Sequence, residues 1–215
     1  SRMKRSKQLL GAVSTIALIA FSASPALAGG STAGSSITNN VSVSFDVGGV
    51  TQTAVTASNT FTVDRKIDVL VDFAGTAATS VAPGTQNQVL AFDVTNLSNA
   101  VVDIRLAAAL NAGNAANIAN FEVYRDTNGD RSLSAAELAA GPITYLDEVA
   151  ADGTVAVIVI ADIGLGAVNG NEFDVVLTGT AREGGTAGTQ GAAITQTAGA
   201  NTAGVDTVFT DGAGT

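Results

Sequence analysis

The residues best suited to chemistry lie in one short segment rich in side-chain oxygens. Aligned to the twelve-residue calcium loop, Asp126, Asn128 and Asp130 take positions 1, 3 and 5. Ser132 then offers its carbonyl at position 7 and Glu137 its carboxylate at position 12. Calcium binds several oxygens at once, and side chains at alternate positions of a tight loop converge on one point. The pattern predicts a Ca²⁺ site on these five residues, with an extracellular affinity of about 10⁻⁴–10⁻³ M.

Arg131 stands where calcium loops carry the glycine that turns the backbone sharply. A residue with a side chain costs about 1 kcal/mol there, and this one places a positive charge near the cation. A purely structural interpretation also fits. Asp, Asn and Gly favour turns, and Ser134 with Glu137 forms a capping box that opens a short helix ended by Gly141. Both interpretations stay open from the sequence.

Other candidates for catalysis are weaker. Asp147, Glu148 and Asp152 gather near an expected turn, where solvated charges are commoner than paired catalytic carboxylates. The chain has no His and no Cys. These absences remove the commonest general base, the usual zinc ligand and any thiol nucleophile. We therefore expect a protein that is not an enzyme.

The first residues have the three parts of a secretory signal peptide. A basic segment at 3–7 precedes an apolar run at 9–21, and small residues follow at Ala26 and Ala28. The apolar run is shorter than the roughly 20 residues that a membrane-spanning helix needs. We predict that residues 1–28 are a cleaved signal peptide. The protein would then be secreted or held at the cell surface, with no membrane span after cleavage.

The remainder of the chain is strongly acidic. Residues 29–215 hold 6 of the 10 basic residues and all 19 acidic residues, a net charge of −13. Binding to nucleic acid requires clustered Lys and Arg, so nucleic acid is excluded as a partner. An anionic membrane surface is disfavoured for the same reason. An acidic surface instead suits solubility outside the cell and the binding of divalent cations.

Alternation of apolar and polar residues predicts strands throughout residues 37–181. Val41, Val43, Phe45 and Val47 form the first half-buried strand, and Gly48-Gly49 predicts a hairpin turn after it. Further strand patterns, separated by Gly, Asn and Pro turns, occur at 61–73, 90–94, 102–106, 121–124, 143–146, 155–160 and 173–177. The continuous apolar run at 155–160 suits a strand buried on both faces. The pattern predicts an all-β fold, an antiparallel immunoglobulin-like β-sandwich with a short helix after the calcium-type loop.

The two ends of this segment differ from it in composition. Residues 29–36 are rich in Gly and Ser and predict a flexible lead-in. Residues 182–215 are rich in Gly, Ala and Thr with few large apolar groups, which predicts a tail or linker. One edge strand is expected in it, from Val205, Val208 and Phe209. The sandwich domain is thus predicted to span 37–181.

Three stretches resemble a known family: SVSFDVGGVTQTAVTASNTFTVDRKIDVLV (42–71), VAPGTQNQVLAFDVTNLSNAVVDIRLAA (81–108) and YRDTNGDRSLSAAE (124–137). They are similar to the N-terminal region of large secreted proteobacterial surface proteins that carry conserved-repeat domains of unknown function. The resemblance implies an immunoglobulin-like sandwich. It also implies a calcium site between strands, carried by Asp126, Asn128 and Asp130, and it offers no catalytic residues.

The sequence as a whole favours a non-catalytic structural or adhesive module, stabilised by calcium and secreted or displayed on the cell surface. Its expected partners are copies of itself or other surface proteins. One alternative is a fibre or matrix subunit, in which the segment 37–47 adds as a strand to the sheet of the next copy. Another is a glycan-binding or hydrolase accessory module. The absence of Trp and the presence of only two Tyr disfavour it, because sugar-binding faces usually present aromatic rings.

Overall fold

The computed structural model describes residues 30–75, 77–199 and 201–210, so the predicted signal peptide lies outside the described residues. Strands make up 47% of the structure and helices 5%, which confirms the prediction of an all-β protein. Nearly all strand pairs are antiparallel, as predicted. Within the described ranges, no helix is long and apolar enough to cross a membrane.

One layer of the body is a four-stranded antiparallel sheet in the order β6-β7-β11-β9. The strands are β6 (Val69–Phe73), β7 (Gln88–Asn96), β11 (Thr154–Ile163) and β9 (Ile118–Arg125). The prediction that 155–160 is buried on both faces is confirmed for 157–160, where Val157, Ile158 and Val159 are fully buried, whereas Val155 and Ala156 are half-buried. Val157 and Val159 face the main core, whereas Ile158 packs on the outer face beneath Leu133.

The second layer is a three-stranded antiparallel sheet in the order β10-β8-β12. Its strands are β10 (Tyr145–Val149), β8 (Val102–Ala112) and β12 (Asp174–Glu183). The inward side chains of both sheets form one hydrophobic core, which includes Phe92, Val94, Val102, Ile104, Leu106, Val123, Leu146, Val157, Val159 and Leu177. Two short helices connect strands, the 3₁₀ helix η1 (Ala115–Asn117) and α1 (Ala135–Ala140).

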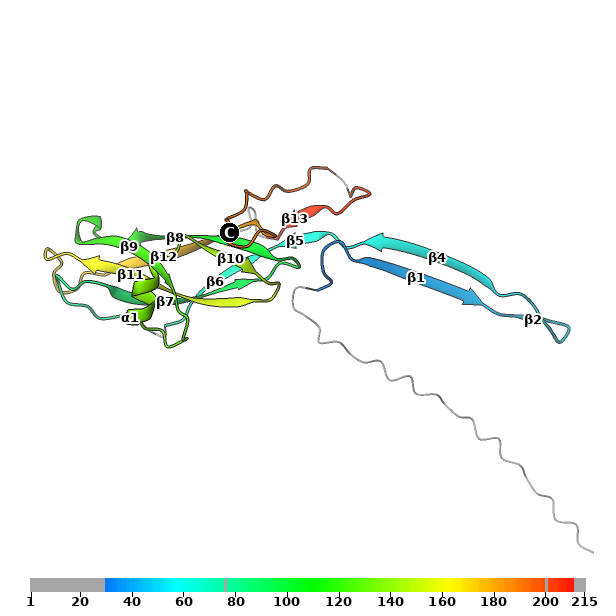
Figure 1. Ribbon diagram of the computed structural model, residues 1–215, viewed down its shortest axis with the longest axis horizontal. Coiled ribbons are helices and arrows are strands. Elements are labelled where there is room, and N and C mark those ends of the chain that lie inside the picture. Colours follow the sequence, from blue (N-terminus) through cyan, green and yellow to red (C-terminus); the bar gives the residue numbers. More distant parts are fainter. Residues whose placement is uncertain (1–29, 76, 200, 211–215) are drawn as a thin grey trace, which may run out of the picture.

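The predicted first hairpin lies outside these two layers. β1 (Ser36–Val43) pairs with β4 (Val55–Thr62), and the ribbon continues through β2 (Asp46–Val47) and β3 (Val50–Thr51). We call residues 36–62 the arm, which Figure 1 shows in blue and cyan, projecting from one end of the body. The predicted strand and turn are confirmed, and Gly48 and Gly49 both have positive φ, as a tight hairpin turn requires. The expected half-burial is wrong, because nearly all side chains of the ribbon are exposed and, within the part of the chain that the structure describes, no second sheet covers it.

The last described segment returns to the base of the arm. β13 (Thr207–Phe209) pairs in parallel with β5 (Arg65–Ile67), which confirms the predicted edge strand. The chain between β12 and β13 also contacts the body, because Ile194 packs against the core, as does Phe209 of β13. Composition alone did not predict this packing.

Candidate functional site

The predicted calcium loop connects β9 to α1 on the outer face of the four-stranded sheet. The helix begins as the sequence predicts, since the Ser134 hydroxyl accepts a hydrogen bond from the Glu137 N–H at 3.3 Å. The Glu137 carboxylate accepts one from the Ser134 N–H at 2.9 Å, which completes the capping box. Gly141 ends the helix with a φ of 87°. The structural interpretation of this segment is therefore confirmed in its helical part.

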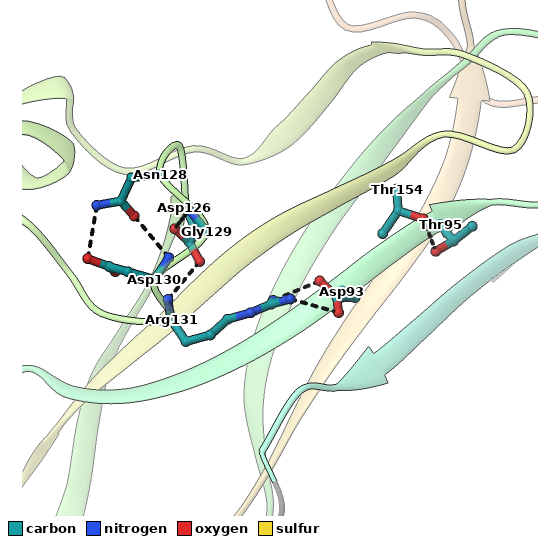
Figure 2. Close-up of polar contacts among 8 residues, drawn as sticks. All are labelled: Asp93, Thr95, Asp126, Asn128, Gly129, Asp130, Arg131 and Thr154. Atoms are coloured by element: carbon teal, nitrogen blue, oxygen red, sulfur yellow. Dashed lines mark hydrogen bonds and ion pairs between the residues drawn. The ribbon is translucent and has the colours of Figure 1, made fainter.

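The loop's own backbone occupies the oxygens that were expected to bind calcium. Asp126 accepts hydrogen bonds from the N–H groups of Gly129, at 2.7 Å, and Arg131, at 3.1 Å. Asn128 accepts one from the Asp130 N–H at 3.1 Å and donates one to the Asp130 carboxylate at 2.9 Å. Figure 2 shows these bonds gathered within a single tight turn. Such bonds define the loop from within, in the manner of Asp and Asn turns.

The carboxylate of Glu137 joins the start of the loop to the start of the helix. One of its oxygens accepts hydrogen bonds from the N–H and hydroxyl of Thr127, at 2.7 and 3.1 Å. The other accepts bonds from the N–H and hydroxyl of Ser134, at 2.9 and 2.8 Å. Donors that stabilise the ionised form, those of Ser134 first, lower the pKa of Glu137 from its ordinary 4.5 to about 2. This buried carboxylate therefore has a structural role in holding the loop.

The five predicted ligands all lie on this one loop, but their acidic oxygens do not converge. Among the described residues, three acidic side chains with oxygens within 4.8 Å of one another occur at Asp103, Asp147 and Glu148, and the loop residues form no such group. Glu137 instead faces Thr127 and Ser134. A cation bound at the loop would have to compete with backbone N–H groups for the same oxygens.

Arg131 has the backbone conformation that calcium loops assign to glycine, with a φ of 63°. Its guanidinium donates two hydrogen bonds to Asp93 on β7, at 2.7 and 3.0 Å, as Figure 2 shows. The hydrogen bond to Asp93 raises the pKa of Arg131. The side chain thus pairs with a strand of the body, and its charge also interacts with Asp126 of the loop.

The acidic group on the second sheet differs by one member from the cluster that the sequence suggests. Asp147 and Glu148 lie on β10, but Asp103 on β8 accompanies them in place of Asp152. The antiparallel pairing of β10 with β8 brings Asp103 close, from more than 40 positions earlier in the chain. No local pattern could have found this residue, because the strand register alone creates the contact.

These three carboxylates hold the loop that follows β12. Asp103, which is fully buried, accepts hydrogen bonds from the N–H groups of Glu148, at 2.9 Å, and Gly191, at 2.8 Å. Asp147 accepts from Gly188, and Glu148 from the N–H groups of residues 185 and 186. The group has the composition of a cation site, and its hydrogen bonds also account for it as an anchor for residues 184–191.

The arm presents two faces of opposite character. Residues directly opposite in an antiparallel pair share a face, so Ile37 lies beside Phe61, and Val43 beside Val55. The other face carries Ser, Thr and Asn, including Thr38 and Thr60, whose hydroxyls are hydrogen-bonded at 2.8 Å. Val43 is 54% exposed and Val55 61% exposed. The apolar face thus leaves several large side chains in water, although Asn39 and Asn59 pair in its middle.

Comparison with known proteins gives no relative. No protein-family model matches the chain, and no curated protein or solved structure was found to match it. The resemblance suggested by the sequence therefore stays a prediction, and function has to be argued from the geometry.

Of the three sites, the arm is the one whose exposed side chains lack contacts within the described chain. The calcium-type loop and the acidic group have hydrogen-bond partners within the chain for their main carboxylates. The apolar face of the arm has no covering layer in the described chain, and a two-stranded hairpin alone is marginally stable in water. The arm is therefore the best candidate for contact with a partner.

Proposed function

We propose that the protein is an exported, non-catalytic structural subunit that joins copies of itself through the arm. The observation that supports this most strongly is the exposed apolar face of β1 and β4. Exposed apolar surface of this kind marks interaction sites in soluble proteins. The signal-peptide pattern of residues 1–28 supports export to the cell surface or a matrix.

The distribution of charge favours contact through the arm. Residues 36–63 contain a single charged side chain, Asp46, whereas residues 64–215 hold the other 18 acidic residues and 6 basic residues. Two bodies of the same negative sign repel each other when they approach. An arm with a single charge can enter a neighbour with little of this repulsion, which makes it the suitable point of contact between copies.

The test is the dependence of assembly on the apolar face. The protein should form assemblies larger than a monomer at micromolar concentration, and Val43→Asp should abolish them, because a charge cannot be buried without a partner. Ser42→Asp is the matched control, since Ser42 lies next to Val43 on the polar face of the same strand. Size-exclusion chromatography and negative-stain microscopy measure the result. A wild-type protein that stays monomeric would contradict the proposal.

We further propose that calcium stiffens the body at the loop of Asp126, as the sequence spacing suggests. The left-handed backbone at Arg131 supports this, because it is the conformation that position 6 of such loops adopts. With a dissociation constant near 1 mM, calcium at 10 mM would add about 1.4 kcal/mol to stability. The melting temperature should then rise by about 3–6 °C, and Asp126→Ala should remove the rise. An equal rise in the variant would point away from the loop.

The strand order supports an immunoglobulin-like body as part of the same proposal. One sheet of an immunoglobulin domain has its strands in the order A-B-E-D. The four-stranded sheet here has the order β6-β7-β11-β9, so these strands correspond to A, B, E and D in turn. In the second sheet, β8 and β12 correspond to strands C and F, and β10 is an additional strand beside β8. Such sandwiches commonly serve as rigid spacers, which suits a structural subunit.

A further inference from the structure

A cleft opens at the end of the body farther from the arm. β12 begins there at Asp174 and runs towards the arm, where Glu183 pairs with Arg65 at 2.6 Å. The loops that flank the cleft lie at the far end of the body from the arm in Figure 1. The cleft has a volume of about 870 Å³, and its apolar lining includes Phe73, Val81, Leu90, Ile163, Phe173 and Val175.

The cleft exists because one sheet lacks part of a strand at this end. β6 stops at Phe73, opposite Phe92, and the Ala74 N–H still donates to the Ala91 carbonyl. Residues 88–90 of β7 pair with β11, but among the described residues they have no strand beside them on the other side. β12 is also an edge strand. Beyond its pairing with β8, the described residues give it one isolated bridge, from Arg182 to Ala193. Residues 174–181 of β12 thus have an open edge among the described residues, and the first two of them, Asp174 and Val175, line the cleft beside half-buried apolar side chains.

We propose that this cleft receives the arm of a second copy, with the apolar face of the arm covering the apolar lining of the cleft and one arm strand adding to the edge of β12. The inference rests on the proposed function and names the surface that accepts the arm. β1 and β4 each have eight residues, the same number as the open stretch 174–181. Addition of a strand to an open sheet edge supplies backbone hydrogen bonds, and alternate side chains fill the pockets.

The position of the two surfaces determines the form of the assembly. The arm and the cleft lie at opposite ends of the molecule, and they are different surfaces, so the contact is heterologous. A heterologous contact that does not close into a ring gives an open linear array. The protein would form filaments in which each arm enters the body of the next copy.

Charge at the cleft is compatible with this occupant. Glu172 and Asp174 are the acidic residues of its lining, and both are exposed at the mouth. The arm brings Asp46 as its one charge, near the tip. A body surface carrying several carboxylates would be a poorer fit, since buried like charges destabilise a contact.

The first experiment tests the cleft by substitution. Phe73→Asp places a charge at the rim, where Phe73 is 45% exposed, and Leu70→Asp is the matched control on the same strand outside the cleft. In the protein expressed from its full-length sequence, Phe73→Asp should abolish filaments and Leu70→Asp should keep them. Filaments that persist with Phe73→Asp but vanish with Val43→Asp would overturn the cleft as acceptor and leave the proposed function intact.

The second experiment mixes two defective variants. Val43→Asp retains an intact cleft and Phe73→Asp retains an intact arm, so an equimolar mixture should give a discrete dimer of one copy of each. Analytical ultracentrifugation measures this dimer. A mixture that stays monomeric, while each variant keeps the wild-type circular-dichroism spectrum, would overturn the proposal, because arm-to-arm pairing gives no such rescue.

A disulfide cross-link tests the same contact independently if the Phe73→Asp variant does not fold. The chain has no cysteine, so Val43→Cys and Phe73→Cys introduce single thiols. After mild oxidation of the mixed proteins, the disulfide should join the two different variants. A disulfide formed chiefly between two Val43→Cys copies would indicate arm-to-arm contact and would overturn the cleft, while keeping the arm as the contact.

Discussion

The strands of the body and of the arm share one sequence pattern, but their apolar side chains are buried in the body and exposed in the arm. On β7, Phe92 and Val94 alternate with polar residues and are buried at 6% and 0% exposure. On β1, Val41 and Val43 alternate with polar residues in the same way and remain exposed at 59% and 54%. Alternation specifies a strand with one apolar face, whereas burial needs a second layer that local sequence does not name. The arm therefore has a strand pattern like that of the body, but among the described residues no second sheet packs on its apolar face.

The largest expected difference between the two regions is in the cost of removing an apolar side chain. Ile104→Ala should lower the free energy of unfolding by about 2–5 kcal/mol, because Ile104 is fully buried between the sheets. Val43→Ala should change the stability of the dilute monomer by less than about 0.5 kcal/mol. Urea denaturation at low protein concentration measures both. Equal losses in the two variants would contradict the division into body and arm.

The junction between arm and body should be the next most sensitive place. The Asn99 side chain donates hydrogen bonds to the carbonyls of Ser31 and Asp64, at 3.0 and 2.8 Å, and accepts one from the Lys66 N–H at 2.8 Å. Asn99→Ala should cost about 1–3 kcal/mol, because it leaves partly buried backbone groups without partners. Asn111→Ala, at an exposed site on β8, should cost much less. Thermal unfolding of the two variants gives the comparison.

Acid should weaken the body through Glu137 and leave the arm unaffected. The folded pKa of about 2 lies below the ordinary 4.5, so this stabilisation is present above about pH 4.5 and is lost as pH falls towards 2. Glu137→Gln should be less stable at neutral pH and should show a flatter decline across that window. Glu172→Gln, an exposed carboxylate, is the control. An unchanged acid profile in Glu137→Gln would refute the structural role of this side chain.

The smallest expected effect is at Arg131. Arg131→Ala removes the ion pair with Asp93 and should cost about 0.2–1 kcal/mol, since both groups are partly exposed. Arg131→Gly removes the same pair but also relieves the positive φ, which is worth about 1 kcal/mol. Arg131→Gly should therefore be the more stable of the two by about 1 kcal/mol in denaturant unfolding. The reverse order would show that the left-handed backbone carries no strain.

Local features of the sequence were sufficient to predict much of the body. The apolar run at 155–160, the capping box of Ser134 and Glu137, and the turn at Gly48-Gly49 all depend on neighbours a few residues away. The acidic group was missed in part, because Asp103 reaches Asp147 only through the register of β8 and β10. The positions of the carboxylates in the loop could not be predicted either, because hydrogen bonds from backbone N–H groups fix the side chains of Asp126 and Glu137.

The exposure of the arm could not be read from its own residues. Val41 and Val43 have the pattern of a strand within a sandwich, and only the topology shows that no described segment covers them. The cleft was hidden for a related reason. The sequence pattern ends the strand at Phe73, but it does not show that β7 pairs with β11 from Gln88 on and so extends beyond the end of β6. At both surfaces, an apolar face or a strand edge has no neighbouring strand among the described residues.

Hydrogen exchange at increasing protein concentration tests the central claim most directly. If the arm joins copies, the amides of β1 and β4 should exchange more slowly as concentration rises, whereas those of β11, already buried in the body, should not change. Exchange from the arm that is fast at every concentration, in a protein whose body is fully protected, would contradict the account.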